Sequence, residues 1–133
     1  MVKSYRDLEV WRLGRDLVQT IYLCTAQFPK SETYGLASQM RCAAVSVPSN
    51  IAEGQARNSM LQFLQFISFA LGSLAELETQ LELASRLDYG GAGIRAALSQ
   101  AQLLGRKLRC LQNALKAKGR TNTNHQPPVT SHL

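Results

Sequence analysis

The fold of this chain depends on how one interprets the central stretch Ser46-Val47-Pro48-Ser49-Asn50-Ile51-Ala52-Glu53-Gly54. A proline inside a helix removes one backbone hydrogen bond and clashes with the preceding turn, at a cost of about 3 kcal/mol. An apolar stripe nevertheless continues in register through it, with the members Leu36, Met40, Ala43, Val47 and Ile51. This continuity predicts one helix, kinked at Pro48 and ending near Gly54, rather than two separate helices.

Working outward, periodicity places another helix before the central one. It covers about residues 5–28, and Ser4 with Asp7 resembles a capping box at its start. Pro29 closes this helix, because the residue before a proline is pushed out of the helical region. The central helix then begins after Ser31, which we predict to be its N-cap.

A third helix, about residues 60–87, follows a capping pattern formed by Ser59 and Gln62. Its first half is apolar on most of its circumference, which requires burial on more than one side. A second copy of the chain can supply the further cover, so we expect an oligomer. We see no run that approaches the roughly 20 apolar residues needed to span a bilayer, and we expect no membrane partner.

The fourth helix, about residues 92–118, has an apolar seam with steps of three and four, typical of a helix bundle. The seam consists of Ile94, Ala97, Ala101, Leu104, Leu108, Leu111 and Leu115. Four helices with short connections predict an all-α fold, an antiparallel up-down four-helix bundle with a proline-kinked second helix. We assign residues 1–118 to the bundle and 119–133 to a disordered polar tail.

Charge is divided unevenly along the chain. Residues 1–90 carry eight Lys/Arg and nine Asp/Glu, whereas residues 91–133 carry seven Lys/Arg and no acid. This division indicates either an anionic partner or a solvated helix face with a solubilising tail. Among anionic partners we favour nucleic acid over a membrane, because the bundle core needs the apolar seam opposite the charges.

The basic side of the fourth helix is the main functional lead. Placed at 100° per residue, most of its cations fall on one side, away from the seam and over ~38 Å. Such cations can neutralise backbone phosphates, and the helix has no aromatic residue for base stacking, which favours duplex or structured RNA over single strands. The predicted nucleic-acid-binding residues are Arg95, Arg106, Lys107, Arg109, Lys116 and Arg120, with Arg41 and Arg57 as additions.

The sequence contains no credible catalytic set. A di-iron bundle needs Glu-x-x-His motifs, and the two histidines, His125 and His132, lie in the predicted tail. There is no Walker loop, no GxGxxG and no helical histidine to serve a serine or cysteine as base. We expect no enzyme activity, no cofactor and no metal; a metal or small-molecule site is the least favoured alternative.

The three cysteines, Cys24, Cys42 and Cys110, lie far apart and lack metal-ligand spacing. We interpret them as free residues of the core, which indicates a reducing compartment. The N-terminus lacks the apolar core of a signal peptide, so we expect a cytoplasmic protein.

Asn50 and Glu53 lie one turn or less past Pro48. In the structural interpretation, Asn50 bonds a backbone group freed by Pro48, and Glu53 pairs with Arg41 or Arg57. In the alternative, the two form a polar site for a ligand or another subunit. We favour the structural interpretation.

Four segments agree, in order, with one protein family: Tyr5-Arg6-Asp7-Leu8-Glu9-Val10-Trp11, Phe28-Pro29-Lys30-Ser31-Glu32-Thr33-Tyr34-Gly35-Leu36, Ser49-Asn50-Ile51-Ala52-Glu53-Gly54 and Ala70-Leu71-Gly72-Ser73-Leu74-Ala75-Glu76-Leu77-Glu78. They resemble the 23S ribosomal RNA intervening-sequence proteins, four-helix bundle proteins of bacteria. The resemblance covers residues 5–89 by motif and the fourth helix by pattern. That family is in turn similar to the accessory variability determinant of diversity-generating retroelements, a basic bundle that binds nucleic acid and a reverse transcriptase.

The resemblance implies a bundle that assembles into a ring, with a homopentamer as the expected form, and it implies no enzymatic activity. The family's signature residues serve fold and assembly or ligand binding. In this sequence they are Trp11, Pro29, Tyr34, Gly35, Pro48, Asn50, Glu53, Gly54, Gly72 and Glu76. Beside nucleic-acid binding we keep one alternative, a protein–protein adaptor whose working surface is the apolar excess around Phe63, Phe66 and Phe69.

Overall fold

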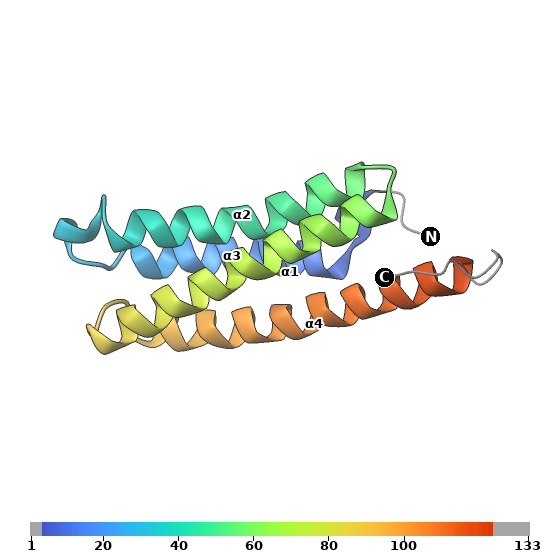
Figure 1. The fold of residues 1–133 in the computed structure, drawn as a ribbon. Helices are drawn as coiled ribbons and strands as arrows, with labels where there is room; N and C mark the ends of the chain where they lie inside the picture. Colours follow the sequence, from blue (N-terminus) through green and yellow to red (C-terminus); the bar gives the residue numbers. More distant parts are fainter. Residues whose placement is uncertain (1–3, 124–133) are drawn as a thin grey trace, which may run out of the picture.

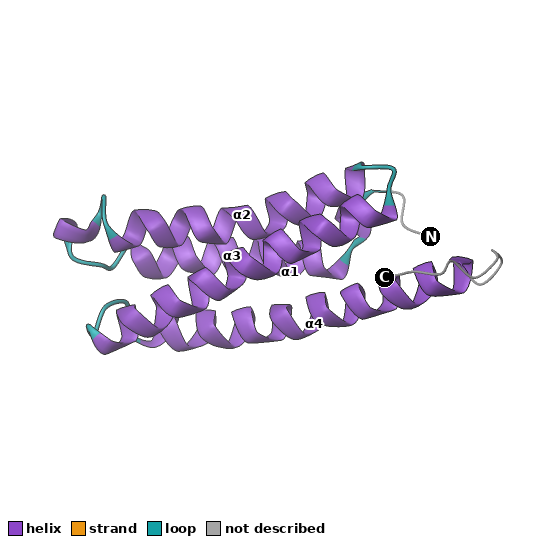
Figure 2. Ribbon diagram, viewed as in Figure 1, coloured by secondary structure: helices purple, strands orange, loops and turns teal. Residues whose placement is uncertain are grey.

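The computed structural model describes residues 4–123, which form helices and no strand (Figure 2). The four α-helices are α1 (Glu9–Thr25), α2 (Leu36–Ala56), α3 (Met60–Arg86) and α4 (Ala92–Thr123). The predicted all-α class is confirmed, and the four helices are consistent with a four-helix bundle.

The helices pack around one core. α2 packs against α1 and α3, and α4 packs against α3 and α1. The α1–α2 and α3–α4 connections lie at one end of the molecule and the α2–α3 connection lies at the other (Figure 1). The largest fully buried side chains are Leu17, Ile21, Met40, Val47, Ile51, Ile67, Leu74, Leu77, Leu81, Leu104 and Leu108.

The predicted capping box at the start of the chain is present. The Asp7 carboxylate accepts a hydrogen bond from the Ser4 N–H at 3.2 Å. It caps a short 3-10 helix, η1 (Tyr5–Asp7), rather than α1 itself, which begins after it. α1 is therefore shorter at both ends than the predicted span of 5–28.

The start of α2 differs from its prediction. Residues Lys30–Glu32 form a second 3-10 helix, η2, and α2 begins at Leu36, with Gly35 at its N-cap making no side-chain cap bond. The Leu36 N–H instead donates to Glu32 Oε1 at 3.1 Å. The prediction that Ser31 is the N-cap is wrong, because η2 delays the helix and brings the Glu32 carboxylate to its first turn.

α2 continues without a break through Pro48, as the register of its apolar stripe predicts. The proline ring faces α1, where a Cβ added to Gly14 would lie 3.3 Å from Pro48 Cβ, so a small residue at this position lets the ring approach. Further on, Gly54 brings α2 close to α3. A Cβ added to Gly54 would lie 2.6 Å from Phe66 Cβ, closer than packing permits.

α3 begins as predicted, with Ser59 Oγ accepting a hydrogen bond from the Gln62 N–H at 3.2 Å. By length and composition alone, α3 is apolar enough to cross a membrane, contrary to our expectation from the sequence. Core helices of bundles meet the same criterion. However, only 22% of the most apolar 18-residue stretch of α3 is buried in the structure. The fold of one chain therefore leaves much of this apolar surface uncovered.

α4 is longer than predicted, because it continues past Lys118 and through Gly119 to Thr123. A glycine costs a helix only about 1 kcal/mol relative to alanine. The Met60 sulfur lies 3.3 Å from the place that a Cβ on Gly119 would occupy, so α4 still packs against α3 there. The rest of the predicted tail, residues 124–133 with both histidines, lies outside the described residues.

The cysteines do not share one environment. Cys24 is buried, whereas Cys42 and Cys110 are exposed, and all three are free thiols. The prediction of three core cysteines is therefore wrong for two of them, since apolar neighbours along the sequence do not place a residue on the inner side of a helix. Burial raises the pKa of the Cys24 thiol above its ordinary value.

Candidate nucleic-acid interface

The inner side of α4 fixes which of its side chains point outward. Ile94, Ala97, Ala101, Leu104 and Leu108 are buried in the core. Leu111 and Leu115, which continue the same seam, are partly buried against it. The predicted seam is confirmed, and its packing loosens toward the C-terminal part of the helix.

Four cations are exposed along the outer side of α4, and we call them the α4 stripe: Arg95, Arg106, Arg109 and Lys116. Among the described residues, none of the four takes part in an ion pair or a side-chain hydrogen bond. At 1.5 Å per residue, the stripe extends over about 32 Å of helix. Arg120 also lies within α4, beyond the last described side chains.

The C-terminal half of the stripe borders α3. Gln112 Nε2 donates to Ser68 Oγ of α3 at 3.3 Å, which joins the outer sides of the two helices. Lys116 lines a shallow hollow together with Leu61 and Leu64 of α3. A cationic surface and an apolar surface therefore meet along this edge.

Lys107 is not brought together with the stripe. Its side chain lies toward α1, where Nζ is 3.2 Å from Glu9 Oε2. The Lys107 and Glu9 side chains are 41% and 59% exposed, so solvent screens the pair and it adds little to stability. The pair nevertheless occupies the ammonium group and neutralises its charge locally.

Arg41 and Arg57 also lie apart from the stripe, on α2 and at its C-cap, and within the described residues the backbone of α2 does not closely approach that of α4. Arg41 Nε donates to Thr25 Oγ1 at 2.8 Å, and its guanidinium carbon lies 4.6 Å from the centroid of the Tyr22 ring. Arg57 lies 3.0 Å from Glu53 Oε2 and stacks on the ring of Phe66. One continuous surface does not include all eight predicted cations.

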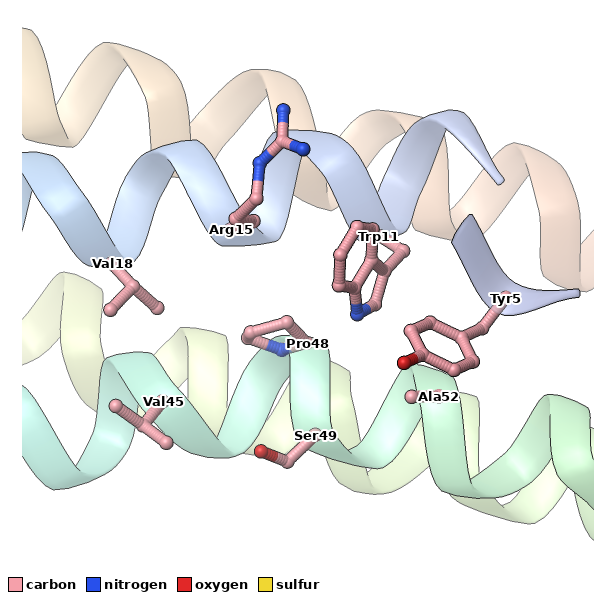
Figure 3. Close-up of a pocket in the computed structure, with 8 residues that line it drawn as sticks. All are labelled: Tyr5, Trp11, Arg15, Val18, Val45, Pro48, Ser49 and Ala52. Carbon is pink, nitrogen blue, oxygen red and sulfur yellow. The ribbon is translucent and has the colours of Figure 1, made fainter. Parts of the chain in front are cut away.

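Sequence reasoning missed a second surface, a groove between α1 and α2 (Figure 3). It consists of two adjoining hollows of about 310 and 710 Å³ that share Val45 and Ser49. We call it the aromatic groove. It is lined by Tyr5, Trp11, Arg15, Val18, Tyr22, Thr33, Tyr34, Ser38, Arg41, Cys42, Val45, Ser46, Pro48, Ser49 and Ala52.

Aromatic rings and guanidinium groups are paired along this groove. The Tyr5 and Trp11 rings are 5.0 Å apart at an angle of 66°. The guanidinium of Arg15 lies 5.5 Å from the Trp11 ring, and that of Arg41 covers Tyr22. The lining contains two arginines and no carboxylate; Arg15 pairs with Asp16 at 3.1 Å, so among the described residues Arg41 is the lining cation without an acidic partner in this otherwise apolar groove.

A signal for the groove was present in the sequence. Trp11, Arg15, Val18 and Tyr22 are spaced by four, three and four residues, which places them on one side of a helix. On α2, Arg41, Val45, Ser49 and Ala52 follow a similar spacing. Each stripe alone is compatible with an ordinary solvated side, and the groove arises because α1 packs against α2 with these sides adjacent.

The polar residues after Pro48 are engaged within α2. Asn50 Nδ2 donates to the Ser46 carbonyl at 2.8 Å, rather than to the Ala44 carbonyl whose helical donor Pro48 lacks. Glu53 pairs with Arg57, one of its two predicted partners. These contacts favour the structural interpretation of both residues, although the carbonyl that Asn50 binds differs from the predicted one.

The signature residues are distributed over several surfaces. Trp11, Tyr34 and Pro48 line the aromatic groove, and Tyr34 is 95% exposed. Gly72 and Glu76 are exposed on α3, where a Cβ added to Gly72 would meet nothing within 4 Å. Much of this set is therefore available for contacts outside the single chain.

The three phenylalanines of the adaptor alternative do not form one exposed surface. Phe63 and Phe66 turn toward Gly54 of α2 and are partly buried, and Phe69 is 49% exposed. The exposed apolar side of α3 instead carries Leu61 and Leu83, which are 77% and 47% exposed.

Within residues 4–123, the structure shows no group of three or more His, Cys, Asp or Glu side chains that could hold a metal ion. The Ser46 and Ser73 hydroxyls bond each other across the α2–α3 contact. That bond joins two helices, and no histidine of the described chain is available to activate either hydroxyl.

Comparison with protein families gives one match. The family model described as 23S rRNA-intervening sequence protein matches residues 6–110. A comparison with curated proteins finds no match. The matched range contains nearly all of the aromatic groove and the first three cations of the α4 stripe, whereas Lys116 lies after it.

Proposed function

The chain belongs to the 23S rRNA-intervening sequence protein family, and we propose that it is a non-enzymatic, homo-oligomeric protein that binds nucleic acid through the α4 stripe. One observation carries this proposal: the four cations of the stripe are exposed and, among the described residues, have no acidic partner. Arginine presents a planar fork of donors that suits phosphate oxygens, and three of the four cations are arginines.

The expected ligand is a duplex or a structured RNA. α4 carries no Phe, Tyr or Trp, so it offers no platform on which unpaired bases stack. A helix with cations over about 32 Å instead suits the regularly spaced phosphates of a double helix. Recognition of this kind depends on shape and charge rather than on base sequence.

The proposal includes finer features of the architecture. We infer an antiparallel up-down bundle with a kink at Pro48, and a ring of identical subunits for which the family resemblance suggests a homopentamer. The same resemblance suggests a relationship to the accessory variability determinant of retroelements and a bacterial, cytoplasmic setting. A ring repeats the α4 stripe, so contacts that are weak in one subunit gain avidity in the assembly.

A protein–protein adaptor remains the second candidate, because a specific observation favours it. α3 leaves Leu61, Phe69 and Leu83 at the surface. Exposed apolar residues on one side of a helix are typical of interaction surfaces. In this alternative, the apolar side of α3 binds another protein and the α4 stripe only maintains solubility.

The decisive experiment reverses the charge of the middle of the stripe in the double variant Arg106→Glu/Arg109→Glu. Binding to a labelled RNA hairpin and to duplex DNA is measured between 50 and 300 mM salt, with the mass of the protein recorded alongside. Loss of two phosphate contacts is expected to lower the affinity at least about fifty-fold at 0.1 M salt and the salt slope by about 2. The oligomeric mass is expected to stay unchanged.

The matched control is Lys30→Glu/Lys118→Glu, which makes the same change in net charge away from the stripe. Lys30 lies in η2, and Lys118 lies on the side of α4 that carries Lys107. This control is expected to keep most of the affinity. Equal losses in both double variants would show a response to net charge alone, and unchanged binding in the stripe variant would contradict the proposal.

A further inference from the structure

The outer side of α3 is largely without a partner in the single chain, apart from its edge with α4, where Ser68 Oγ accepts a hydrogen bond from Gln112. Small residues occupy its middle, where Ser68, Gly72, Ala75 and Thr79 are all exposed. Leu61 and Leu83 lie toward its two ends, 77% and 47% exposed. We call these six residues the α3 outer face. Small residues in the middle allow a close approach, and the two leucines provide apolar area to bury.

The aromatic groove has the complementary features. Its floor on α2 contains the short side chains of Val45, Ser49 and Ala52, and Trp11 and Tyr22 stand beside them on α1 (Figure 3 shows all of these except Tyr22). Trp, Tyr and Arg are the residue types that most often dominate binding energy in protein interfaces. A groove with a floor of small residues between aromatic side chains suits an apolar helix.

Together the two surfaces hold most of the exposed large apolar residues of the described chain. Nine such residues are exposed; Tyr22, Tyr34 and Val45 line the groove, and Leu61 and Leu83 belong to the α3 outer face. Charge is also complementary: α3 carries three glutamates against one arginine, whereas the groove is lined by no carboxylate and by two arginines, of which Arg15 pairs with Asp16 at 3.1 Å. Arg41 in particular has no carboxylate partner among the described residues.

We propose that the aromatic groove of one chain receives the α3 outer face of a second copy. This inference rests on the proposed homo-oligomer and names its interface. Because the two surfaces differ, each chain donates one and accepts one, and such head-to-tail contacts generate closed rings or open filaments. Arg95, Arg106 and Arg109 of the stripe line neither surface and stay accessible to nucleic acid in the assembly, whereas Lys116 borders the α3 outer face at Leu61.

The test uses one variant for each surface in the full chain. Val45→Arg places a long cation in the groove floor, at a residue that is 40% exposed. Gly72→Arg places the same side chain in the middle of the α3 outer face, where a Cβ has open space and an arginine favours the helix over glycine. The control Ala96→Arg adds equal charge on exposed α4. Circular dichroism establishes that each variant is folded.

Mass is measured by light scattering after gel filtration. The wild type and Ala96→Arg are expected to form the oligomer, and each surface variant alone is expected to run as a monomer of 14.7 kDa. An equimolar mixture of the two surface variants is expected to form a dimer of about twice that mass, since one intact groove and one intact α3 outer face remain to pair. The double variant Val45→Arg/Gly72→Arg is expected to stay monomeric, since both of its surfaces are altered.

Several results would overturn the inference. Surface variants that keep the wild-type mass would show that the interface lies elsewhere, and two monomeric variants that do not pair on mixing would show that these surfaces do not bind each other. A monomeric wild type that co-sediments with vesicles of zwitterionic phosphatidylcholine, which do not attract the α4 stripe electrostatically, would assign the α3 outer face to a lipid surface. RNA binding by the same samples is recorded separately. Its absence would contradict the nucleic-acid proposal while leaving the masses to decide this one.

Discussion

α3 and α4 are the two longest helices of the molecule, and they differ in what the fold leaves on their outer sides. Each contributes a continuous inner stripe to the same core. The sequence of α4 has seven cations and no acid, and four of these cations are exposed along its outer side, whereas α3 presents small and apolar residues together with acids. The difference shows that a helix can satisfy the bundle with one side and carry an unrelated role on the other.

The same contrast separates two kinds of partner. Exposed cations retain their hydration until phosphates replace it, so the α4 stripe is stable in water and its binding depends on salt. Exposed leucines and aromatic rings gain from leaving water, so the α3 outer face and the aromatic groove are expected to be covered at moderate protein concentration. Two substitution pairs and one comparison of thiol reactivity can break or sharpen this comparison.

The largest expected effect comes from the inner stripe of α4. Leu104 is fully buried, and Leu104→Ala is expected to lower the free energy of unfolding by about 2–5 kcal/mol, through lost transfer energy and the cavity left behind. Leu61→Ala on α3 removes the same atoms from a side chain that is 77% exposed and is expected to cost less than about 0.5 kcal/mol within one subunit. Urea denaturation at two protein concentrations measures both.

The concentration dependence makes this pair informative about assembly. A loss for Leu61→Ala that is present at high protein concentration and shrinks as the protein is diluted would place its contribution between subunits, since association stabilises by mass action. A large loss at Leu61 that is independent of concentration would contradict the distinction between inner and outer sides.

The sequence predicted the inner stripes well, because helical periodicity is a local property that every buried turn repeats. The seam of α4 and the unbroken register of α2 through Pro48 were accessible for this reason. Helix ends were less predictable: η2 displaced the start of α2, and α4 continued through Gly119, because short-range packing decided between nearly equal local conformations. The α4 stripe followed from the same periodicity, but Lys107 turned toward Glu9 of a helix distant in sequence.

The aromatic groove could not be derived in this way. It requires α1 and α2 to pack with two particular sides adjacent, and it includes Tyr34 from the connection between them. Likewise, Cys42 and Cys110 have apolar neighbours in the sequence, yet the pitch of their helices places them outside. Properties that depend on the pairing of two helices are therefore the ones that single-helix patterns miss.

An intermediate effect is expected from two glycines that sequence patterns do not distinguish. Gly54→Ala places a Cβ 2.6 Å from Phe66 Cβ at the α2–α3 contact and is expected to destabilise by about 1–3 kcal/mol. Gly72→Ala places a Cβ in open space on the α3 outer face and is expected to stabilise the single subunit by up to about 1 kcal/mol, the helix propensity difference. Thermal unfolding followed by circular dichroism compares them, and equal signs for the two would contradict the assigned packing.

The smallest expected effect is a difference in thiol reactivity, and it bears directly on the two outer surfaces. The thiolate is the reactive form, and burial raises the pKa of Cys24, so at pH 8 this thiol holds less thiolate than an exposed one and is also shielded from the reagent. Cys110 lies exposed on α4, and Cys42 lines the aromatic groove. In the assembled wild type, alkylation by iodoacetamide is expected to be fastest at Cys110, slower at Cys42 and slowest at Cys24.

In the Val45→Arg variant, Cys42 is expected to react about as fast as Cys110, because its groove then has no occupant. Raising the pH toward 9.5 increases the thiolate fraction of Cys24, so its rate relative to the exposed thiols is expected to rise with pH. Peptide mass spectrometry at successive times measures the three rates. Equal rates at Cys42 and Cys110 in an intact oligomer would mean that the groove stays open when the chains assemble. The contrast between a covered apolar surface and a free cationic surface would then rest on the α3 outer face alone.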